Sequence, residues 1–103
     1  MEKYKIRYIL EAIDDLDEIL LYIAKDSVEN ALKMYDEIRK NINKLDTFPK
    51  RGRLVPDKNM ARLGIRMLFI SSYIVFYRII GEEVFIYRII HGKQNYPMLF
   101  KIE

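Results

Sequence analysis

The residues of this chain that could carry acid–base chemistry gather around its single histidine, His91. Arg88 and Lys93 stand within three positions of it, and Arg66 begins an earlier apolar run. An imidazole can act as a general acid or base near neutral pH, and neighbouring cations can hold a phosphate. A single histidine at the end of a strand is usually an ordinary surface residue, and the functional alternative is that His91 acts as the acid or base of a phosphate-handling cleft.

The composition excludes several other kinds of active site. The chain of 103 residues has no cysteine, which excludes disulfides, thiolate metal sites and cysteine nucleophiles. One histidine does not meet the common zinc spacings, and the four glycines are too scattered for a phosphate-binding loop. The three serines lie at an expected helix start and in an expected turn, which disfavours a serine hydrolase. We therefore expect no metal and no cofactor.

Charge is divided unevenly along the chain. The segment up to Phe48 has eight basic and eleven acidic residues, whereas the remainder has ten basic and four acidic ones. The second half is therefore suited to approach phosphates or an acidic partner, although solubility alone also accounts for a net charge of +3. Tyrosines beside arginines in the second half are typical of surfaces that stack bases, and equally of an ordinary sheet.

No segment of the sequence predicts a membrane span. The longest apolar stretch, Ile19 to Ala24, is far shorter than the ~20 residues that a spanning helix needs. The first residues also lack a hydrophobic signal core. We expect a cytoplasmic protein that does not bind membranes.

The first half of the chain predicts a strand and two helices. Residues 3–9 alternate polar and apolar side chains, as a half-buried strand does, and residues 10–25 have the period of an amphipathic helix with an acidic outer face. Asp26 and Glu29 have the spacing of a capping box, which would start a second helix that ends before Phe48 and Pro49. Two long helices joined this closely should form an antiparallel hairpin.

The second half predicts a basic loop at 50–63 and then three strands, at 65–70, 73–80 and 84–90. A turn centred on Gly81 and Glu82 would pair Tyr77 with Ile86 and Val75 with Arg88. The fold expected is one α+β domain over residues 1–103, ordered β-α-α-β-β-β. The helical hairpin would pack on one face of a four-stranded, mainly antiparallel sheet, leaving the other face free for a ligand.

Several motifs in this order resemble the RelE/ParE superfamily of toxins from type II toxin–antitoxin, or plasmid stabilisation, systems. They cover almost the whole chain and comprise the Asp15 to Ile19 segment followed by Tyr22-Ile23, Leu45 with Phe48-Pro49, Gly52-Arg53, Gly64 with Arg66, the Tyr73 to Tyr77 run, and Val84 to His91 with Tyr96.

The resemblance implies a small α+β toxin that arrests bacterial growth and an antitoxin that binds it, in a hetero-oligomeric complex. RelE-like members cut messenger RNA in the ribosomal A site, whereas ParE-like members poison DNA gyrase. Ile74 and Gln94 stand where RelE-like nucleases tend to have further basic residues, so the ParE-like mechanism is preferred. An inactive relative that acts only as an antitoxin-bound co-repressor is the third reading.

Each reading assigns residues. For an mRNA interferase, Arg66 and Arg88 would bind phosphate, His91 would be the acid or base, Lys93 would stabilise charge, and Tyr96 would stack a base. For a gyrase inhibitor, the predicted target contacts are Arg53, Arg62, Tyr73, Tyr77 and Arg88. The antitoxin is predicted to cover apolar residues that lie outside the apolar face expected to pack in the core, namely Leu32, Met34, Met98, Leu99 and Phe100.

Overall fold

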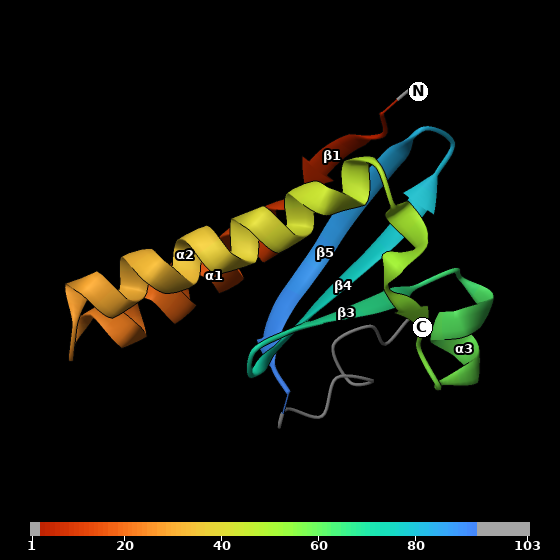
Figure 1. The fold of residues 1–103 in the computed structure, drawn as a ribbon. Helices are drawn as coiled ribbons and strands as arrows, with labels where there is room; N and C mark the ends of the chain where they lie inside the picture. Colours follow the sequence, from red (N-terminus) through yellow and green to blue (C-terminus); the bar gives the residue numbers. More distant parts are fainter. Residues whose placement is uncertain (1–2, 93–103) are drawn as a thin grey trace.

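The computed structural model describes residues 3–92 of the chain and forms a mixed five-stranded sheet with three α-helices (Figure 1). The elements in chain order are β1 (Lys5–Tyr8), α1 (Leu10–Ala24), α2 (Val28–Asn43), the 3-10 turns η1 (Lys44–Asp46) and η2 (Pro49–Arg51), β2 (Arg53–Leu54), α3 (Lys58–Arg62), β3 (Arg66–Ile70), β4 (Tyr73–Ile80) and β5 (Glu83–His91).

The strands lie in the order β1-β5-β4-β3-β2, and only the β1–β5 pair is parallel. A parallel pair needs a long connection, and most of the chain between these two strands lies in the helices and the other strands. The α+β class and the mainly antiparallel sheet are as expected from the sequence. The fifth strand, β2, was expected to be loop, because two residues are too few to show an alternating pattern.

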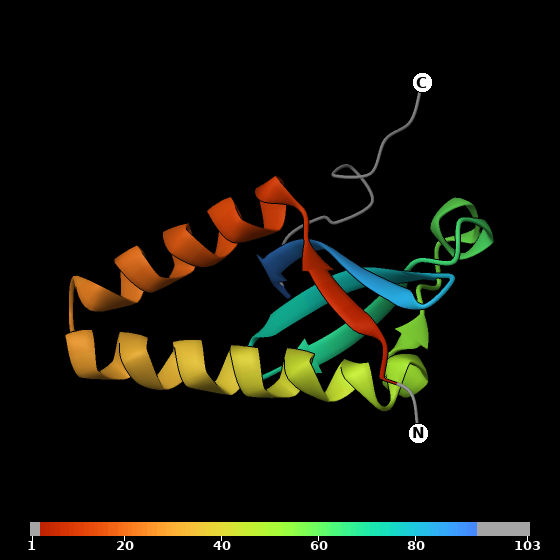
Figure 2. The same ribbon diagram turned by 90° about the horizontal axis from the view of Figure 1, so that it is seen from above.

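The helical hairpin of α1 and α2 covers one face of the sheet, as expected, and its far end extends beyond the strands (Figure 2). The main core lies beneath it and comprises Ala12, Leu16, Ile38, Ile42, Leu45, Leu68, Ile70, Val75, Tyr77, Val84, Ile86 and Ile89. The apolar side chains of Ile38 and Ile42 on α2 are therefore used for packing on the sheet.

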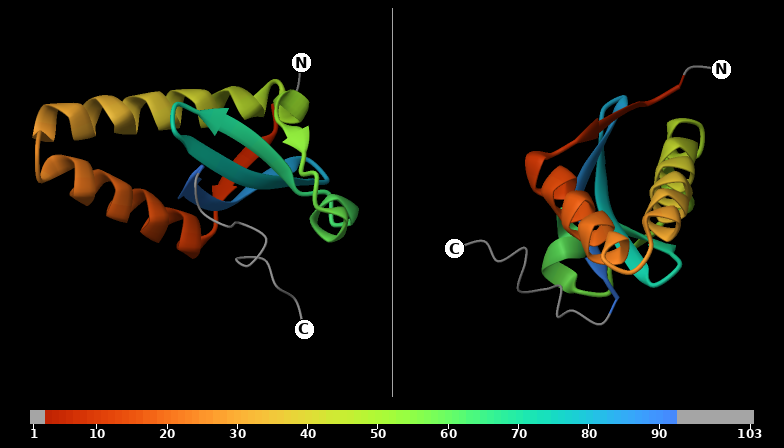
Figure 3. Two further views of the ribbon diagram at one scale, coloured as in Figure 1. Left: turned by 90° about the horizontal axis from the view of Figure 1, so that it is seen from below. Right: turned by 90° about the vertical axis from the view of Figure 1, so that its left-hand side faces the viewer.

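The opposite face of the sheet is partly covered, so the expectation of a free face is wrong. A second apolar cluster joins Val55, Met60 and Ile65 to strand residues such as Phe76 and Ile90. Met60 lies on α3, a short helix within the segment expected to be loop, which packs away from the helical hairpin (Figure 3). Its five residues were too few to show a helical period in the sequence.

The N-cap of α2 is one residue later than expected. Ser27, in an extended conformation, accepts a hydrogen bond from the backbone N–H of Asn30 through its hydroxyl. Asp26 instead lies at the end of the α1–α2 connection, where its backbone N–H donates to Ile23. Serine and aspartate cap equally well in general, so the sequence pattern alone does not choose between these neighbours.

The β4–β5 hairpin has the expected turn but a shifted register. Ile80 pairs with Glu83 around Gly81 and Glu82, and Tyr77 pairs with Ile86 as expected. A β-bulge then shifts the register between Phe76 and Tyr77, so that Val75 pairs with Ile89 and not with Arg88. The expectation that Arg88 shares the face of Tyr73 and Tyr77 is therefore wrong, because the extra residue re-aims the strand.

Candidate functional site

A groove lies between α1 and the end of β5. Its volume is about 820 Å³, and it is lined by Asp15, Glu18, Ile19, Leu21, Tyr22, Lys25, Tyr73, Arg88, Ile89, Ile90 and His91. Three of the sequence-predicted site residues, Tyr73, Arg88 and His91, therefore line one hollow. Lys93 and Tyr96 lie outside the described residues.

Arg88 is held in this groove by an ion pair with Asp15 of α1. Its Nε and Nη2 atoms donate to the two carboxylate oxygens at 2.7 and 2.9 Å. The hydrogen bond that Arg88 donates to Asp15 raises the pKa of Arg88, and burial opposes this shift. The charges of Asp15, Glu11 and Glu18 raise the pKa further. The arginine is thus permanently charged, and a protein carboxylate occupies two of its donors.

The same carboxylate also accepts a hydrogen bond from the backbone N–H of Ile89, at 2.9 Å. Strand β1 ends at Tyr8, and its pairing with β5 ends at Ile86. Beyond that point the edge of β5 has no neighbouring strand within residues 3–92, and Asp15 takes the place of a strand partner for one amide. Sequence analysis assigned Asp15 to a solvated acidic face, and the local pattern has no signal that separates it from Asp14 or Asp17.

His91 ends β5 and packs against Tyr73, its cross-strand partner on β4. The two rings meet edge to face, with centroids 5.6 Å apart and an interplanar angle of 79°. This contact orients the imidazole at the mouth of the groove.

Arg66 lies away from this groove, on β3, which β4 separates from β5 in the sheet. It begins β3, and its guanidinium donates to the carbonyl oxygen of Gly52 at 2.8 Å. Arg66 pairs with Tyr77 in the β3–β4 register, whereas His91 pairs with Tyr73 at the opposite end of β4. The structure therefore does not bring Arg66 together with Arg88 and His91.

Tyr77 is fully buried beside Arg66 and holds the same turn. Its hydroxyl donates to the carbonyl oxygen of Pro49 at 2.7 Å and accepts from the N–H of Gly52 at 2.8 Å. Burial raises the pKa of Tyr77, against the effects of the Gly52 hydrogen bond and the Arg66 charge. This side chain anchors the η2 turn to the sheet and offers no surface to a target.

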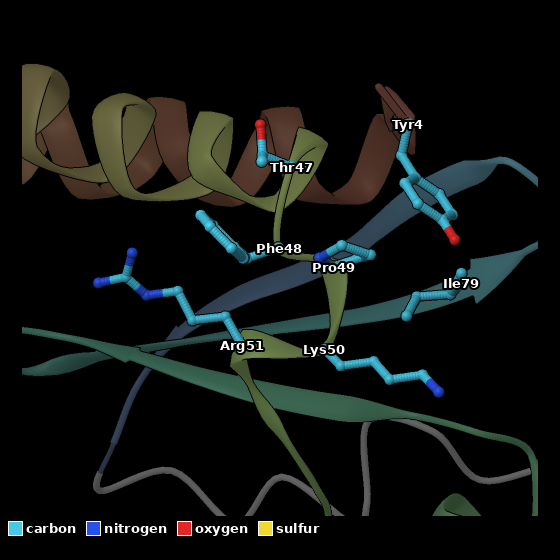
Figure 4. A pocket seen from close by; sticks show the side chains of 7 residues that line it. All are labelled: Tyr4, Thr47, Phe48, Pro49, Lys50, Arg51 and Ile79. Atoms are coloured by element: carbon cyan, nitrogen blue, oxygen red, sulfur yellow. The ribbon is translucent and has the colours of Figure 1, made fainter. Parts of the chain in front are cut away.

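A second hollow, of about 800 Å³, opens where η1 and η2 meet the end of β4 (Figure 4). Apolar side chains of Tyr4, Phe48, Pro49 and Ile79 line it, and Lys50 and Arg51 extend from its turn in different directions. Within residues 3–92 there is no cluster of histidine and acidic side chains that could hold a metal ion.

Comparison with known proteins identifies the chain. A family model described as "ParE toxin of type II toxin-antitoxin system, parDE" matches residues 6–96. The chain belongs to the ParE toxin family. Among curated relatives, a protein of Sinorhizobium fredii described as "Putative toxin Y4kP" is 32% identical over 99 residues, covering 96% of this chain and 99% of the relative. Toxin ParE3 of Caulobacter vibrioides is 32% identical over 82 residues, covering 79% of each chain.

Solved structures agree with the fold of this ParE-family toxin. A chain of the chromosomal ParDE toxin–antitoxin system from P. aeruginosa superposes with a TM-score of 0.71 at 24% identity, covering 86% of this toxin and 96% of that chain. A chain of the RelBE2 toxin–antitoxin complex from Mycobacterium tuberculosis gives a TM-score of 0.58 at 25% identity, covering 86% and 98%. The family match and these structures together place the toxin in the RelE/ParE superfamily of type II toxins.

The remaining predicted contact residues of the toxin are distributed over several surfaces. Arg53 on β2 and Arg62 on α3 are exposed, whereas Tyr73 is half-buried at the groove. Of the predicted antitoxin contacts, Leu32 is 61% exposed on α2, and Met34 packs against the main core. Met98, Leu99 and Phe100 lie outside the described residues. No helix in the described part of the toxin is long and apolar enough to cross a membrane.

Proposed function

We propose that this toxin arrests bacterial growth by inhibiting DNA gyrase, and that its antitoxin relieves the inhibition by binding the toxin. Membership of the ParE family supports this mechanism over mRNA cleavage. Gyrase inhibition needs a surface complementary to another protein, and it needs no proton-transfer site on the toxin.

The observation that carries the proposal is the separation of Arg66 from Arg88. Attack of a ribose 2′-hydroxyl on phosphorus needs cations that converge on one phosphate. Here the Arg66 guanidinium is bound to the Gly52 carbonyl near β2, and the Arg88 guanidinium is bound to Asp15 of α1 beside β5, the second strand across the sheet from β3. Within the described residues, these two predicted phosphate ligands do not converge.

Ribosome-dependent mRNA cleavage is the second candidate, because Arg88 and His91 line one groove. For this chemistry, a phosphate would have to bind the Arg88 donors that Asp15 does not occupy, or displace Asp15. The two mechanisms therefore make opposite predictions for His91→Ala, which should abolish cleavage of mRNA but should leave gyrase inhibition intact.

Two assays with purified toxin distinguish the mechanisms. In the first, gyrase supercoils a relaxed plasmid with increasing toxin, and we expect supercoiling to fall and to recover when the antitoxin is added. In the second, translating ribosomes with a defined message are expected to yield no cleavage product. Message cleavage with normal supercoiling would overturn the proposal, and inactivity in both assays would indicate an inactive relative.

Exposed cations in the second half of the chain are the proposed gyrase contacts. The double variant Arg53→Gln/Arg62→Gln should lose inhibition and keep the melting temperature of the parent, because both side chains are exposed. Lys33→Gln is the matched control, since it removes one exposed positive charge from the helical hairpin and only an exposed ion pair with Glu29. Equal inhibition by the double variant and the parent would withdraw the assignment.

A further inference from the structure

A strip of two aromatic rings and three cations runs around the β2 edge of the toxin. We define the aromatic–basic strip as Phe48, Lys50, Arg51, Arg53 and Phe69. It crosses the η2 turn, β2 and the neighbouring part of β3. It is separate from the groove that contains Arg88 and His91, since the two share no lining residue.

Neighbouring hollows along the strip share lining residues. A hollow of about 240 Å³ shares Thr47 and Phe48 with the one of about 800 Å³ in Figure 4. The latter shares Arg51 with a third, of about 400 Å³, which extends past Arg53 to Phe69. An elongated ligand could therefore follow the surface from η1 to β3.

The two rings of the strip are open to solvent. Phe48 is 65% exposed and Phe69 is 54% exposed. The Arg53 guanidinium lies 5.5 Å from the centre of the Phe69 ring. A flat aromatic face thus stands directly beside a cation, as in surfaces that bind an unpaired base and its phosphate together.

Positive charge dominates the strip and its continuation. Lys40 and Lys44 line the adjoining hollow next to Phe48. The acidic residue that lines the same hollow, Asp46, has its carboxylate 3.8 Å from the Lys3 ammonium. A strongly anionic, elongated partner is therefore favoured over a neutral one.

We propose that the aromatic–basic strip binds single-stranded DNA. The phosphates would lie against Lys50, Arg51 and Arg53, and unpaired bases would stack on Phe48 and Phe69. Every base has a π-face, so such binding needs no particular sequence. Duplex DNA would satisfy the cations but would leave the rings without exposed base faces. The inference does not rest on gyrase inhibition, because the binding is a property of the toxin alone.

The test measures fluorescence anisotropy of a labelled 12-nucleotide DNA strand with the purified, full-length toxin at several salt concentrations. Three phosphate contacts should give a log–log salt slope of about −2. Arg51→Gln should weaken binding and reduce the magnitude of the slope by about 0.7. Phe48→Leu and Phe69→Leu should each weaken binding about fivefold or more with the slope unchanged, because they remove only a stacking face.

Lys33→Gln again serves as the charge-matched control and should bind like the parent. A duplex of the same sequence should bind more weakly than the single strand. The proposal is overturned if duplex binds more tightly, if the phenylalanine variants bind like the parent, or if no binding is seen at low salt with toxin at about 10⁻⁴ M. Loss of antitoxin binding in the strip variants, with no DNA binding by the parent, would instead identify a protein interface.

The gyrase assay reports separately on the proposed function. If the strip variants lose DNA binding but still inhibit supercoiling, the strip is confirmed as a DNA site that inhibition does not require. If the parent binds DNA but does not inhibit gyrase, the proposed gyrase inhibition is wrong and the proposed DNA site on the aromatic–basic strip is retained.

Discussion

The carboxylate of Asp15 is bound to the guanidinium of Arg88 and to the next backbone amide along β5, although 73 positions separate the two residues in sequence. The ion pair is mostly shielded, with side-chain exposures of 26% for Arg88 and 12% for Asp15. It fastens α1 to the part of β5 that β1 does not reach.

Replacing Asp15 by alanine should therefore destabilise the toxin. The change leaves Arg88 and the Ile89 N–H without this acceptor, and we expect a loss of about 1.5–3 kcal/mol in the free energy of unfolding, measured by urea denaturation. Asp14→Ala is the control, since Asp14 is exposed on the same helix and should change stability by less than about 0.5 kcal/mol. Equal effects of the two changes would show that the ion pair is not structural.

The hydroxyl of Tyr77 should matter for stability as well. Tyr77→Phe removes the hydroxyl that accepts from the N–H of the buried Gly52 and donates to the Pro49 carbonyl. Both backbone groups then lose this hydrogen-bond partner. An unsatisfied buried polar group costs about 1–3 kcal/mol, so the urea midpoint should fall. Tyr87→Phe is the control, because Tyr87 is only half-buried. A midpoint unchanged by Tyr77→Phe would contradict the anchoring role.

Gly52 is required for the close approach of the η2 turn to the sheet. A Cβ atom there would lie 2.7 Å from the Met67 carbonyl oxygen and 2.7 Å from the Tyr77 hydroxyl. We expect Gly52→Ala to cost about 1–3 kcal/mol, as overpacking does, and to lower the melting temperature. Gly92→Ala should be much milder, since its nearest neighbour would be the Ser72 carbonyl at 3.4 Å. Similar melting temperatures for both variants would count against this packing.

The periodic segments of the fold were predictable from the sequence. The long helices carry apolar side chains every three to four residues, and the Gly81-Glu82 turn sets the hairpin, so both could be located from local patterns. Strand β2 and helix α3 have two and five residues, too few for a period to be visible. Their formation depends on contacts with β3 and with the second apolar cluster.

The candidate site was less predictable, because its key relationships are tertiary. The β-bulge opposite Phe76 and Tyr77 changes which residue pairs with Val75. No residue type in this part of the sequence predicts such a bulge. Tyr77 was expected to be a contact residue, but whether a strand tyrosine is buried depends on what packs over it. Asp15 is one of several carboxylates on α1. It meets Arg88 because the pairing of β1 with β5 ends at Ile86, which leaves the next part of β5 open to α1.

The stability of the toxin should fall at high pH because of two tyrosines. Burial raises the pKa of Tyr8 and of Tyr77 above the ordinary value of 10.0. The folded state therefore retains protons that the unfolded state loses above about pH 10, and the unfolding free energy decreases as pH rises from there towards the folded-state pKa values. Below that pH these groups contribute no pH dependence.

Urea denaturation at closely spaced pH values above neutrality would measure this decline. Tyr77→Phe should make it shallower, because one of the two titrating hydroxyls is gone, while lowering stability at neutral pH. A decline of equal steepness in the variant and the parent would exclude Tyr77 as a source of the effect.

The start of α2 provides a pair of adjacent residues with opposite expected behaviour. Ser27 accepts a hydrogen bond from the Asn30 N–H at 3.1 Å, whereas Asp26 is exposed and precedes the cap. Ser27→Ala leaves that N–H without its side-chain acceptor and should cost about 1 kcal/mol, whereas Asp26→Ala should cost less than about 0.5 kcal/mol. Urea midpoints of the two variants, compared with the parent, measure both effects. A larger loss for Asp26→Ala would mean that the aspartate caps α2 in solution, because the helix would then begin one residue earlier.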